Sequence, residues 1–478
     1  MNETILAIDI GSTKICAIIA EVEDERIQII GHGISRSQGV KKGVITNIEL
    51  ASKSIKKAIN DAKRISGSTI STATISISNA YAKSLNSTGI VNIPHKDISI
   101  KEIERVIHTA QYNANVPTEY DVVHILPYNF KVDDQDFIED PYGMNASRME
   151  VDVNIIMTQK SSLSNLKKAV VSAGVNIDGI VLSGYASAIA TMGEDEKELG
   201  VAVIDMGGQT SNLIIHTGNS IRYNDFLSVG SNHITNDLSM ALHTPLQIAE
   251  NVKKRHGNLL NSSTDVIELP VIGDEDNRNE VSLEIVHSVI LARVEEALMI
   301  LSKSLDKSLL KEQIGSGIIL TGGMTKLKGI RELAQAIFDG MPVRIAQPEE
   351  KDIGGLFDEL KDPSFSTVIG LLLYSAGKHT EYEININNQL LHSKHIQTES
   401  FPDDIDKNSH PKSDEKTNLE NIELGGTIKA AQEKRREKKK HKEEEEEENL
   451  DIFTELPDDP LDGGNPIKKF ANWARQLF

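Results

Sequence analysis

The chain has 478 residues, 39% of them hydrophobic, which is enough material for two or more domains with buried cores. Its net charge of −20 disfavours nucleic acid as a partner. Cys16 is the single cysteine, so an intrachain disulfide is excluded, and this fits a reducing cytoplasm. We expect no signal peptide, because the first residues have neither a basic segment nor a long apolar run. We also expect no membrane-spanning helix, because no stretch of about 18 consecutive apolar residues occurs, so any membrane contact would be peripheral.

A duplicated pattern predicts two similar halves. An apolar strand at 5–9 ends in Asp-Ile-Gly and leads through a short polar turn into a second apolar strand at 15–20. Residues 200–211 repeat this order, with Asp-Met-Gly-Gly at the turn. Each copy is typical of a strand, a tight glycine turn and a second strand. Helical patterns follow each copy, at 47–65 and 286–305. We therefore expect two α/β halves facing one cleft.

The glycine turn of each hairpin carries groups that suit a phosphate. Glycine lets the backbone approach a phosphate closely, and the turn amides and hydroxyls can donate hydrogen bonds to its oxygens. A lysine adds a positive point charge. The candidate nucleotide-binding residues here are Asp9, Gly11, Ser12, Thr13 and Lys14 in the first turn, and Asp205, Gly207, Gly208, Gln209 and Thr210 in the second.

The aspartate of each turn is also a candidate metal ligand. Asp9 and Asp205 would end their strands on opposite sides of the cleft, and two carboxylates there suit a Mg²⁺ ion that keeps most of its water molecules. The alternative is that each Asp-x-Gly only shapes a hairpin, and one copy alone would favour that alternative.

Two later elements complete the predicted nucleotide site. A short apolar strand at 318–320 is followed by Thr-Gly-Gly-Met and then by helical spacing at 326–336. Such a strand, glycine turn and helix can lay bare backbone against a base or ribose, which makes candidates of Gly322, Gly323 and Met324. Glu250 and Lys253 lie three residues apart on a predicted helix, where they could bind a ribose or form an ordinary exposed ion pair.

The composition changes after Gly377. Residues 378–464 are polar and charged, and they include a basic run at 434–436 and six consecutive glutamates at 443–448. This composition predicts a disordered linker, because it offers too little apolar area to bury.

Residues 465–478 predict an amphipathic helix. Asn465 and Pro466 are favourable at a helix start, and apolar residues recur at 3–4 spacing with cations beside them. The helix would be about 20 Å long, too short to cross a bilayer, so we expect it to lie among the lipid headgroups. Docking on the protein itself or on a partner is the alternative. The candidate membrane residues are Ile467, Lys468, Lys469, Phe470, Trp473, Arg475, Leu477 and Phe478.

These elements, in this order, resemble the actin, hexokinase and Hsp70 superfamily. Within it, the chain resembles FtsA, the bacterial cell-division homologue of actin. The motifs that carry the resemblance are Asp-Glu-Lys-Glu-Leu-Gly at 195–200, Lys-Arg-His-Gly at 254–257, Asp-Pro-Tyr-Gly-Met at 140–144 and Ser-Thr-Val-Ile-Gly-Leu-Leu at 366–372. The resemblance covers nearly all of residues 4–377.

The resemblance implies an α/β, actin-like (ribonuclease H-like) fold: duplicated domains around a nucleotide cleft, with an inserted α+β subdomain. Residues 178–190 look like the helix that connects the two halves. The implied parts are subdomain 1A at 1–80 with 160–195 and 348–377, the inserted subdomain 1C at 81–159, subdomain 2A at 196–228 with 313–347, subdomain 2B at 229–312, the disordered charged linker at 378–464 and the amphipathic membrane-targeting helix at 465–478.

The function that the resemblance implies is a scaffold that binds ATP and Mg²⁺. It would polymerise on the cytoplasmic face of the cell membrane at the division site, tether the FtsZ ring there and recruit later division proteins. The FtsZ C-terminal tail would bind subdomain 2B, where Arg293 and Glu296 are candidate contacts, a solvated face being the alternative. Gly179 stands where relatives position the attacking water, so we expect ATP binding with at most weak hydrolysis. Gln209 and Asn212 also depart from the family pattern.

Three other functions of the same superfold remain as alternatives. A pilus-assembly protein would not need the C-terminal amphipathic helix. A chaperone would need a folded peptide-binding domain after Gly377, and a kinase would need a carboxylate base, which no sequence feature identifies.

Overall fold

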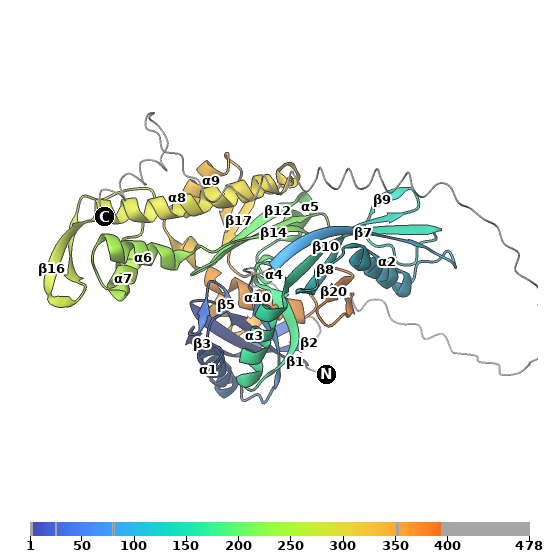
Figure 1. The fold of residues 1–478 in the computed structure, drawn as a ribbon, viewed down its shortest axis with the longest axis horizontal. Coiled ribbons are helices and arrows are strands. Elements are labelled where there is room, and N and C mark those ends of the chain that lie inside the picture. The colour runs from blue at the N-terminus through green and yellow to red at the C-terminus, as the bar shows by residue number, and fades with distance from the viewer. Residues whose placement is uncertain (1–2, 24–25, 79, 81, 350–352, 393–478) are drawn as a thin grey trace, which may run out of the picture. The chain divides into compact units, whose positions relative to one another are not determined.

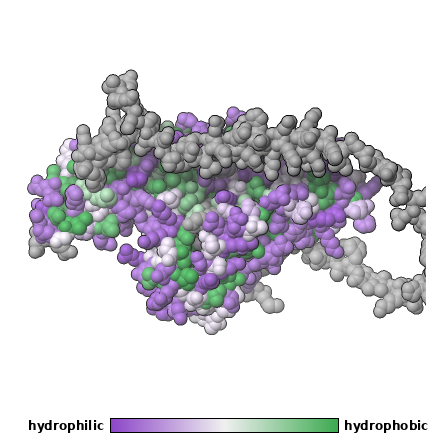
Figure 2. Space-filling model, viewed as in Figure 1, coloured by the Kyte–Doolittle hydropathy of each residue, from purple (hydrophilic) through white to green (hydrophobic). Residues whose placement is uncertain are grey.

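The structure is a computed structural model that describes residues 3–23, 26–78, 80, 82–349 and 353–392. Most of the predicted linker and the whole predicted helix at 465–478 lie outside the described residues. On the face drawn in Figure 2, hydrophilic residues predominate and hydrophobic ones appear in small separate areas. The apolar residues are instead gathered in buried cores, one for each of the three parts described below.

The first half is built on a mixed sheet with the strand order β11-β6-β1-β2-β3-β19. β1 and β2 pair antiparallel up to Ile10 and Ile15, which forms the first predicted hairpin, and β6 runs parallel to β1 on its other side. The strands are β1 (Glu3–Ile10), β2 (Lys14–Glu23), β3 (Arg26–Arg36), β6 (Thr72–Ile77), β11 (Asn176–Leu182) and β19 (Ile353–Gly355), and the small hairpin β4 (Val40–Lys41) and β5 (Val44–Ile45) follows β3.

Helix α1 (Ile48–Ser66) packs on β2 and β3, as Figure 1 shows, and confirms the helix predicted at 47–65. It begins at Asn47, whose side chain accepts a hydrogen bond from the Leu50 N–H at 3.0 Å. The contact with β3 is close because Gly33 has no side chain: a Cβ there would lie 2.0 Å from the Ala58 carbonyl oxygen. Helices α3 (Lys160–Ser172) and α10 (Ser366–Ser375) also belong to this half.

The second half repeats the arrangement, with the strand order β14-β13-β12-β17-β18. β12 and β13 pair antiparallel up to Met206 and Ser211, and β17 runs parallel to β12 on its other side. The predicted duplication is therefore confirmed. The elements are β12 (Val201–Met206), β13 (Ser211–Thr217), β14 (Ser220–Leu227), α6 (Ser231–Ala241), α7 (Leu246–His256), β15 (Val266–Val271), β16 (Asp274–Ser282), α8 (Leu283–Lys307), β17 (Ile318–Thr321), α9 (Ile330–Ile337) and β18 (Val343–Ile345).

The predicted inserted subdomain is a separate antiparallel sheet with a helix against it (Figure 1). Its central strand β10 pairs with both β7 and β8. The apolar side chains of α2 are buried against this sheet around Ile103 and Ile107. The elements are β7 (Ala82–Asn92), α2 (Ile100–Asn113), β8 (Tyr120–Val132), β9 (Gln135–Ile138) and β10 (Arg148–Gln159).

Two predicted helices begin later than the sequence suggested. Residues 178–182 belong to β11, which pairs parallel with β6, and the connecting helix α4 covers only Ser183–Ile189 before the short helix α5 (Glu194–Leu199). The helix expected from 326 begins at Ile330, because Gly329 adopts a left-handed conformation with φ of 89°. A 3-10 turn at Gly323–Lys326 precedes it.

The first residues of the predicted linker form strands. β20 (Glu383–Asn385) pairs with β8 and with β21 (Leu390–Leu391), so the described chain joins the sheet of the inserted subdomain. The contacts of Glu383 account for the position of β20. Its carboxylate is fully buried and accepts hydrogen bonds from the His124 Nδ1 at 2.6 Å, the Tyr374 hydroxyl at 2.8 Å and the Tyr185 hydroxyl at 2.9 Å. These three donors come from β8, α10 and α4. Glu383 therefore connects β20 to the inserted subdomain through β8 and to the first half through α10 and α4.

Candidate functional site

The two glycine turns and the third loop line one cavity of about 190 Å³. It lies where the ends of β1 and β12, the strands of the two hairpins, face each other. Every residue predicted in the two phosphate turns contributes to it, and so do two of the three predicted in the later loop. The predicted residues that line the cavity are Asp9, Gly11, Ser12, Thr13, Lys14, Asp205, Gly207, Gly208, Gln209, Thr210, Gly322 and Gly323.

The two aspartates occupy similar places in the two halves. Ser76 lies on β6, next to β1, and its hydroxyl donates to Asp9 Oδ1 at 2.9 Å. The Ser187 hydroxyl of α4 donates to Asp205 Oδ2 at 2.6 Å. Burial raises the pKa of Asp9 to about 6, and the nearby Asp205 carboxylate adds to that rise. Burial also raises the pKa of Asp205. Two carboxylates are thus held near each other at a free-energy cost.

The donor set fits a hydrated divalent cation. Mg²⁺ prefers carboxylate and water oxygens, and its charge would lower the pKa of both aspartates. Asn212 adds a further acceptor: its Oδ1 is buried, lines the same cavity side by side with Asp205 and has no hydrogen-bond partner among the described residues. Those residues contain no group of three or more His, Cys, Asp or Glu side chains that could hold a metal without water.

The third loop reaches the second aspartate through bare backbone. Gly322 has φ of 90°, and a Cβ on it would lie 2.3 Å from Asp205 Oδ1. The loop is held by the 3-10 turn at Pro363–Phe365, because the Gly322 N–H donates to the Pro363 carbonyl oxygen at 3.2 Å. The same turn receives Lys14, whose Nζ donates to Ser364 Oγ at 3.0 Å and lies 3.3 Å from the centre of the Phe365 ring.

The two phosphate turns touch each other. A Cβ on Gly208 would lie 1.8 Å from Thr13 Oγ1. The turn between β4 and β5 bridges them, since the Lys42 N–H donates to Gln209 Oε1 at 2.8 Å and the next N–H, of Gly43, donates to Ser12 Oγ at 2.7 Å. Gln209 therefore joins the second half to the first.

The other predicted site residues lie outside this cavity. Met324 is buried in the core of the second half. Lys253 Nζ lies 2.6 Å from Glu250 Oε2 on α7 and donates to the Ser231 carbonyl oxygen at 3.0 Å. The two residues thus form an ion pair, but not the exposed one that the sequence suggested, because the Lys253 side chain is only 7% exposed. The pair lies one residue removed from the cavity, which Ser231 lines.

The predicted partner residues on α8 contact each other and α6. Arg293 Nε lies 2.6 Å from Asp237 Oδ2, and Arg293 also pairs with Glu296. The guanidinium is about one-fifth exposed, while Glu296 is about half exposed.

Sequence reasoning missed several lining residues. Ser183, Asn212, Ser231, Ser364 and Thr367 all line the cavity. Thr367 Oγ1 also donates to Asp205 Oδ2 at 3.3 Å. The motif at 366–372 was noticed only as a family resemblance, and a single serine or threonine in a loop carries no signal of its own.

The comparisons with known proteins agree with this architecture. The family model "Cell division protein FtsA" matches residues 202–370, and the model "SHS2 domain inserted in FTSA" matches residues 79–157. The chain is 41% identical to Cell division protein FtsA of Helicobacter pylori over 413 residues, which covers 80% of this chain and 84% of that one. It is 31% identical to the Escherichia coli protein of the same name, covering 81% and 94%.

A solved structure supports the fold. The PilM-PilN type IV pilus biogenesis complex contains a chain with a TM-score of 0.57 at 16% identity, and the match covers 78% of this chain and 98% of that chain. The fold is thus actin-like, with the inserted domain that the second family model describes. Taken with the extent and identity of the matches to its relatives, this establishes that the chain belongs to the FtsA family of bacterial cell-division proteins.

Proposed function

We propose that this chain is an ATP-binding, actin-like scaffold of cell division. In this proposal it polymerises on the cytoplasmic face of the cell membrane at the division site, tethers the FtsZ ring there and recruits later division proteins. One observation carries the nucleotide part: the two Asp-x-Gly turns and the glycine loop after β17 line a single cavity. The family supplies the setting, cell division, and the remaining steps are argued below.

The triphosphate would lie between the two hairpin turns. The hydroxyls of Ser12, Thr13 and Thr210 and the glycine amides can donate to phosphate oxygens. Lys14 can turn from Ser364 toward them. Mg²⁺, bound through water by Asp9 and Asp205, would neutralise charge on the carboxylates and on the phosphates. The third loop, Gly322–Gly323, would receive the adenosine.

Binding must separate the two turns. The cavity of about 190 Å³ is smaller than the usual ligand pocket of about 300–1,000 Å³. Gly208 meets Thr13 across it, so a phosphate can enter only when the halves rotate apart slightly. The nucleotide would thus set the angle between the halves, and that angle would favour or disfavour head-to-tail assembly.

Hydrolysis would be weak at most. Gly179, which the sequence suggested as the position that faces the attacking water, lies in β11 beside Thr74 and is not among the residues that line the cavity, so it supplies no such group there. Positioning the attacking water is a main source of rate in phosphoryl transfer. A binding and assembly role therefore fits this chain better than a metabolic kinase or a chaperone.

Membrane attachment would depend on the segment 465–478, which lies outside the described residues. Among the described helices, none has both the length and the apolar character needed to cross a membrane. A short amphipathic helix binds weakly, with about 1 kcal/mol from each cation over anionic lipid. Many copies on one polymer would bind far more tightly through effective concentration.

The FtsZ tail would bind the subdomain that contains α6 to α8. Arg293 already pairs with both Glu296 and Asp237, and the Glu296 side chain is about half exposed. A peptide carboxylate could exchange for Glu296 on the guanidinium. This would make the arginine a pre-oriented contact rather than a free one.

Sedimentation with vesicles tests the proposal. Wild-type protein should pellet with anionic vesicles in Mg-ATP and carry a fluorescent FtsZ tail peptide with it. Trp473→Glu should lose vesicle binding but keep nucleotide binding measured by calorimetry, and Asp205→Asn should lose nucleotide binding. Equal vesicle binding by wild type and Trp473→Glu would refute the tether. No heat with Mg-ATP would refute the nucleotide site, and turnover with a panel of sugars would favour the kinase alternative.

A further inference from the structure

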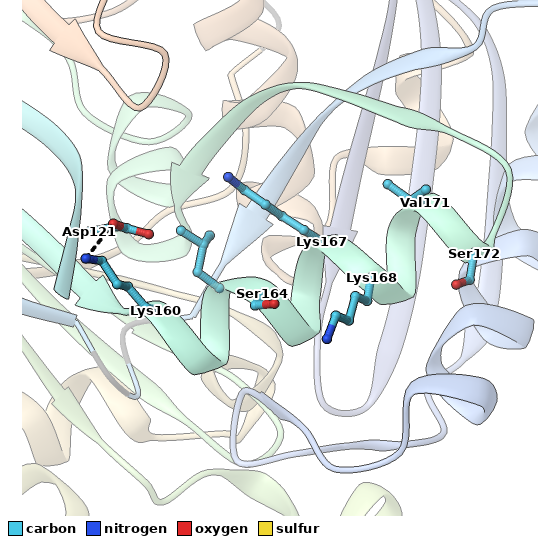
Figure 3. A pocket seen from close by; sticks show the side chains of 8 residues that line it. Asp121, Lys160, Ser164, Lys167, Lys168, Val171 and Ser172 are labelled. Carbon is cyan, nitrogen blue, oxygen red and sulfur yellow. Dashed lines mark ion pairs between the residues drawn. The ribbon is translucent and has the colours of Figure 1, made fainter. Parts of the chain in front are cut away.

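A second hollow lies away from the nucleotide cavity, on the outer face of α3. Its volume is about 470 Å³, and its lining includes Lys160, Lys167, Lys168 and Val171 of α3 (Figure 3). Lys160, Lys167 and Val171 recur at helical spacing, whereas the side chain of Lys168 points to the other side of α3 from that of Lys167 (Figure 3). The sequence of α3 contains three lysines and neither aspartate nor glutamate. This gives the helix a local excess of positive charge in a chain of net charge −20.

Most of that charge has no partner. Lys160 Nζ lies 3.8 Å from Asp121 Oδ1, the ion pair drawn in Figure 3, and donates to the Thr118 carbonyl oxygen at 2.6 Å. Lys167 and Lys168 are exposed and make no ion pair with any residue that the structure describes. Two external carboxylates, one on each side of the helix, could therefore pair with these cations without breaking an existing pair.

The hollow continues into a second one, whose lining includes both apolar and polar side chains. A space of about 750 Å³ between α2, β8 and β20 shares Leu163, Lys167 and Asp121 with the first. Tyr112, which lines it, is 85% exposed, and Val171 at the other end of the surface is 55% exposed. An exposed aromatic ring beside unpaired cations is typical of a protein-binding surface.

We propose that this surface, the α3 groove, binds an acidic, extended peptide segment of a partner protein. Its carboxylates would pair with Lys167 and Lys168, and an apolar or aromatic residue would lie against Tyr112. Lys160 and Val171 are about 16 Å apart along the helix, which an extended peptide of about five residues spans.

A large polyanion fits less well. A nucleic acid presents negative charge to much of the protein surface, and a net charge of −20 opposes that approach. A short peptide meets only the local lysines.

Fluorescence anisotropy with the full chain tests the groove. The probe is a labelled peptide Glu-Glu-Phe-Glu-Glu-Leu, and its counterpart with glutamine at each glutamate is the neutral control. We expect salt-sensitive binding of the acidic peptide, weakened about tenfold in K167E/K168E. The matched variant K56E/K57E reverses two adjacent exposed lysines on α1 that line neither hollow, and it should bind as wild type does.

The other outcomes overturn the groove. No binding of the acidic peptide, equal binding of the neutral one, or equal weakening in both double variants would each refute it. Vesicles of anionic lipid form a separate arm. If K167E/K168E impaired vesicle binding and left peptide binding unchanged, the surface would face lipid rather than a protein. Nucleotide binding, measured in parallel, should be the same in all three proteins, so failure of the groove is distinguishable from failure of the nucleotide site.

Discussion

Asp9→Asn tests whether the paired aspartates weaken the fold until a cation joins them. Burial raises the pKa of Asp9 from 3.8 to about 6, against the lowering effects of the Ser76 hydrogen bond and of Lys14. One pH unit corresponds to about 1.36 kcal/mol, so the ionised carboxylate would cost the folded state about 3 kcal/mol. Asp9 is partly exposed in the cavity, and solvent screening reduces the expected cost to about 1–2 kcal/mol.

The pH dependence follows from the direction of that shift. A carboxyl with a raised pKa costs nothing when it is protonated in both states, below about pH 4. The cost develops as the pH rises from 3.8 to about 6 and is complete above that. Asparagine cannot ionise, and its carbonyl can still accept the Ser76 hydrogen bond. Asp9→Asn should therefore be more stable than wild type near neutral pH and about equal to it in acid.

Urea unfolding followed by circular dichroism, in EDTA and without nucleotide, measures the difference. At about pH 7.5 we expect the variant to have a free energy of unfolding about 1–2 kcal/mol higher than wild type, and at about pH 4 we expect no difference. Asp61→Asn, on the exposed surface of α1, is the control. With saturating Mg-ATP the order should reverse, since ligand stabilises only the protein that binds it. A less stable variant in EDTA, or a gain that is the same at both pH values, would refute this reasoning.

Two further predictions concern contacts between parts of the molecule. Gln209→Gly removes the acceptor of the Lys42 N–H, an exposed hydrogen bond worth about 0.5–1.5 kcal/mol. Nucleotide release should therefore be up to about tenfold faster in a stopped-flow assay. Unchanged release would mean that this contact does not hold the halves together. Glu383→Ala leaves the buried His124 and two tyrosine hydroxyls without their acceptor and should cost about 3–5 kcal/mol. Hydrogen exchange should show the loss first in the amides of β20, and equal protection there in both proteins would contradict it.

The sequence predicted the elements that local chemistry determines. The two hairpins follow from apolar strands joined by glycine turns, and α1 follows from its period and its Asn47 cap. The start of α4 was wrong because Ile180, Val181 and Leu182 fit a buried strand as well as a helix, and only pairing with β6 decides between them. β20 was missed for a similar reason. Its polar surroundings indicate a linker, and two of the three residues that contact Glu383, His124 and Tyr185, are far away in the chain.

The residues that line the cavity also divide into those that the sequence predicts and those that it does not. The glycines and aspartates of the turns could be recognised, since each motif is short and local. Asn212 and Thr367 could not, because their contribution depends on how β13 and α10 are oriented around the cavity. Gln209 was predicted as a nucleotide-binding residue, but its bond to the Lys42 N–H could be found only in the structure.

The position of Glu383 has a mechanical consequence. Any pull on the chain beyond β21 is transmitted through β21 and β20 to the rest of the described part. The force therefore acts on the Glu383 carboxylate, which holds β20. Tyr185, which donates to that carboxylate, lies two residues before Ser187, which donates to Asp205. A pull on the chain at Glu383 and the charge of Asp205 would therefore both act on α4. If the cavity binds nucleotide as proposed, force on the chain would affect the cavity, and nucleotide would affect the contacts that hold β20.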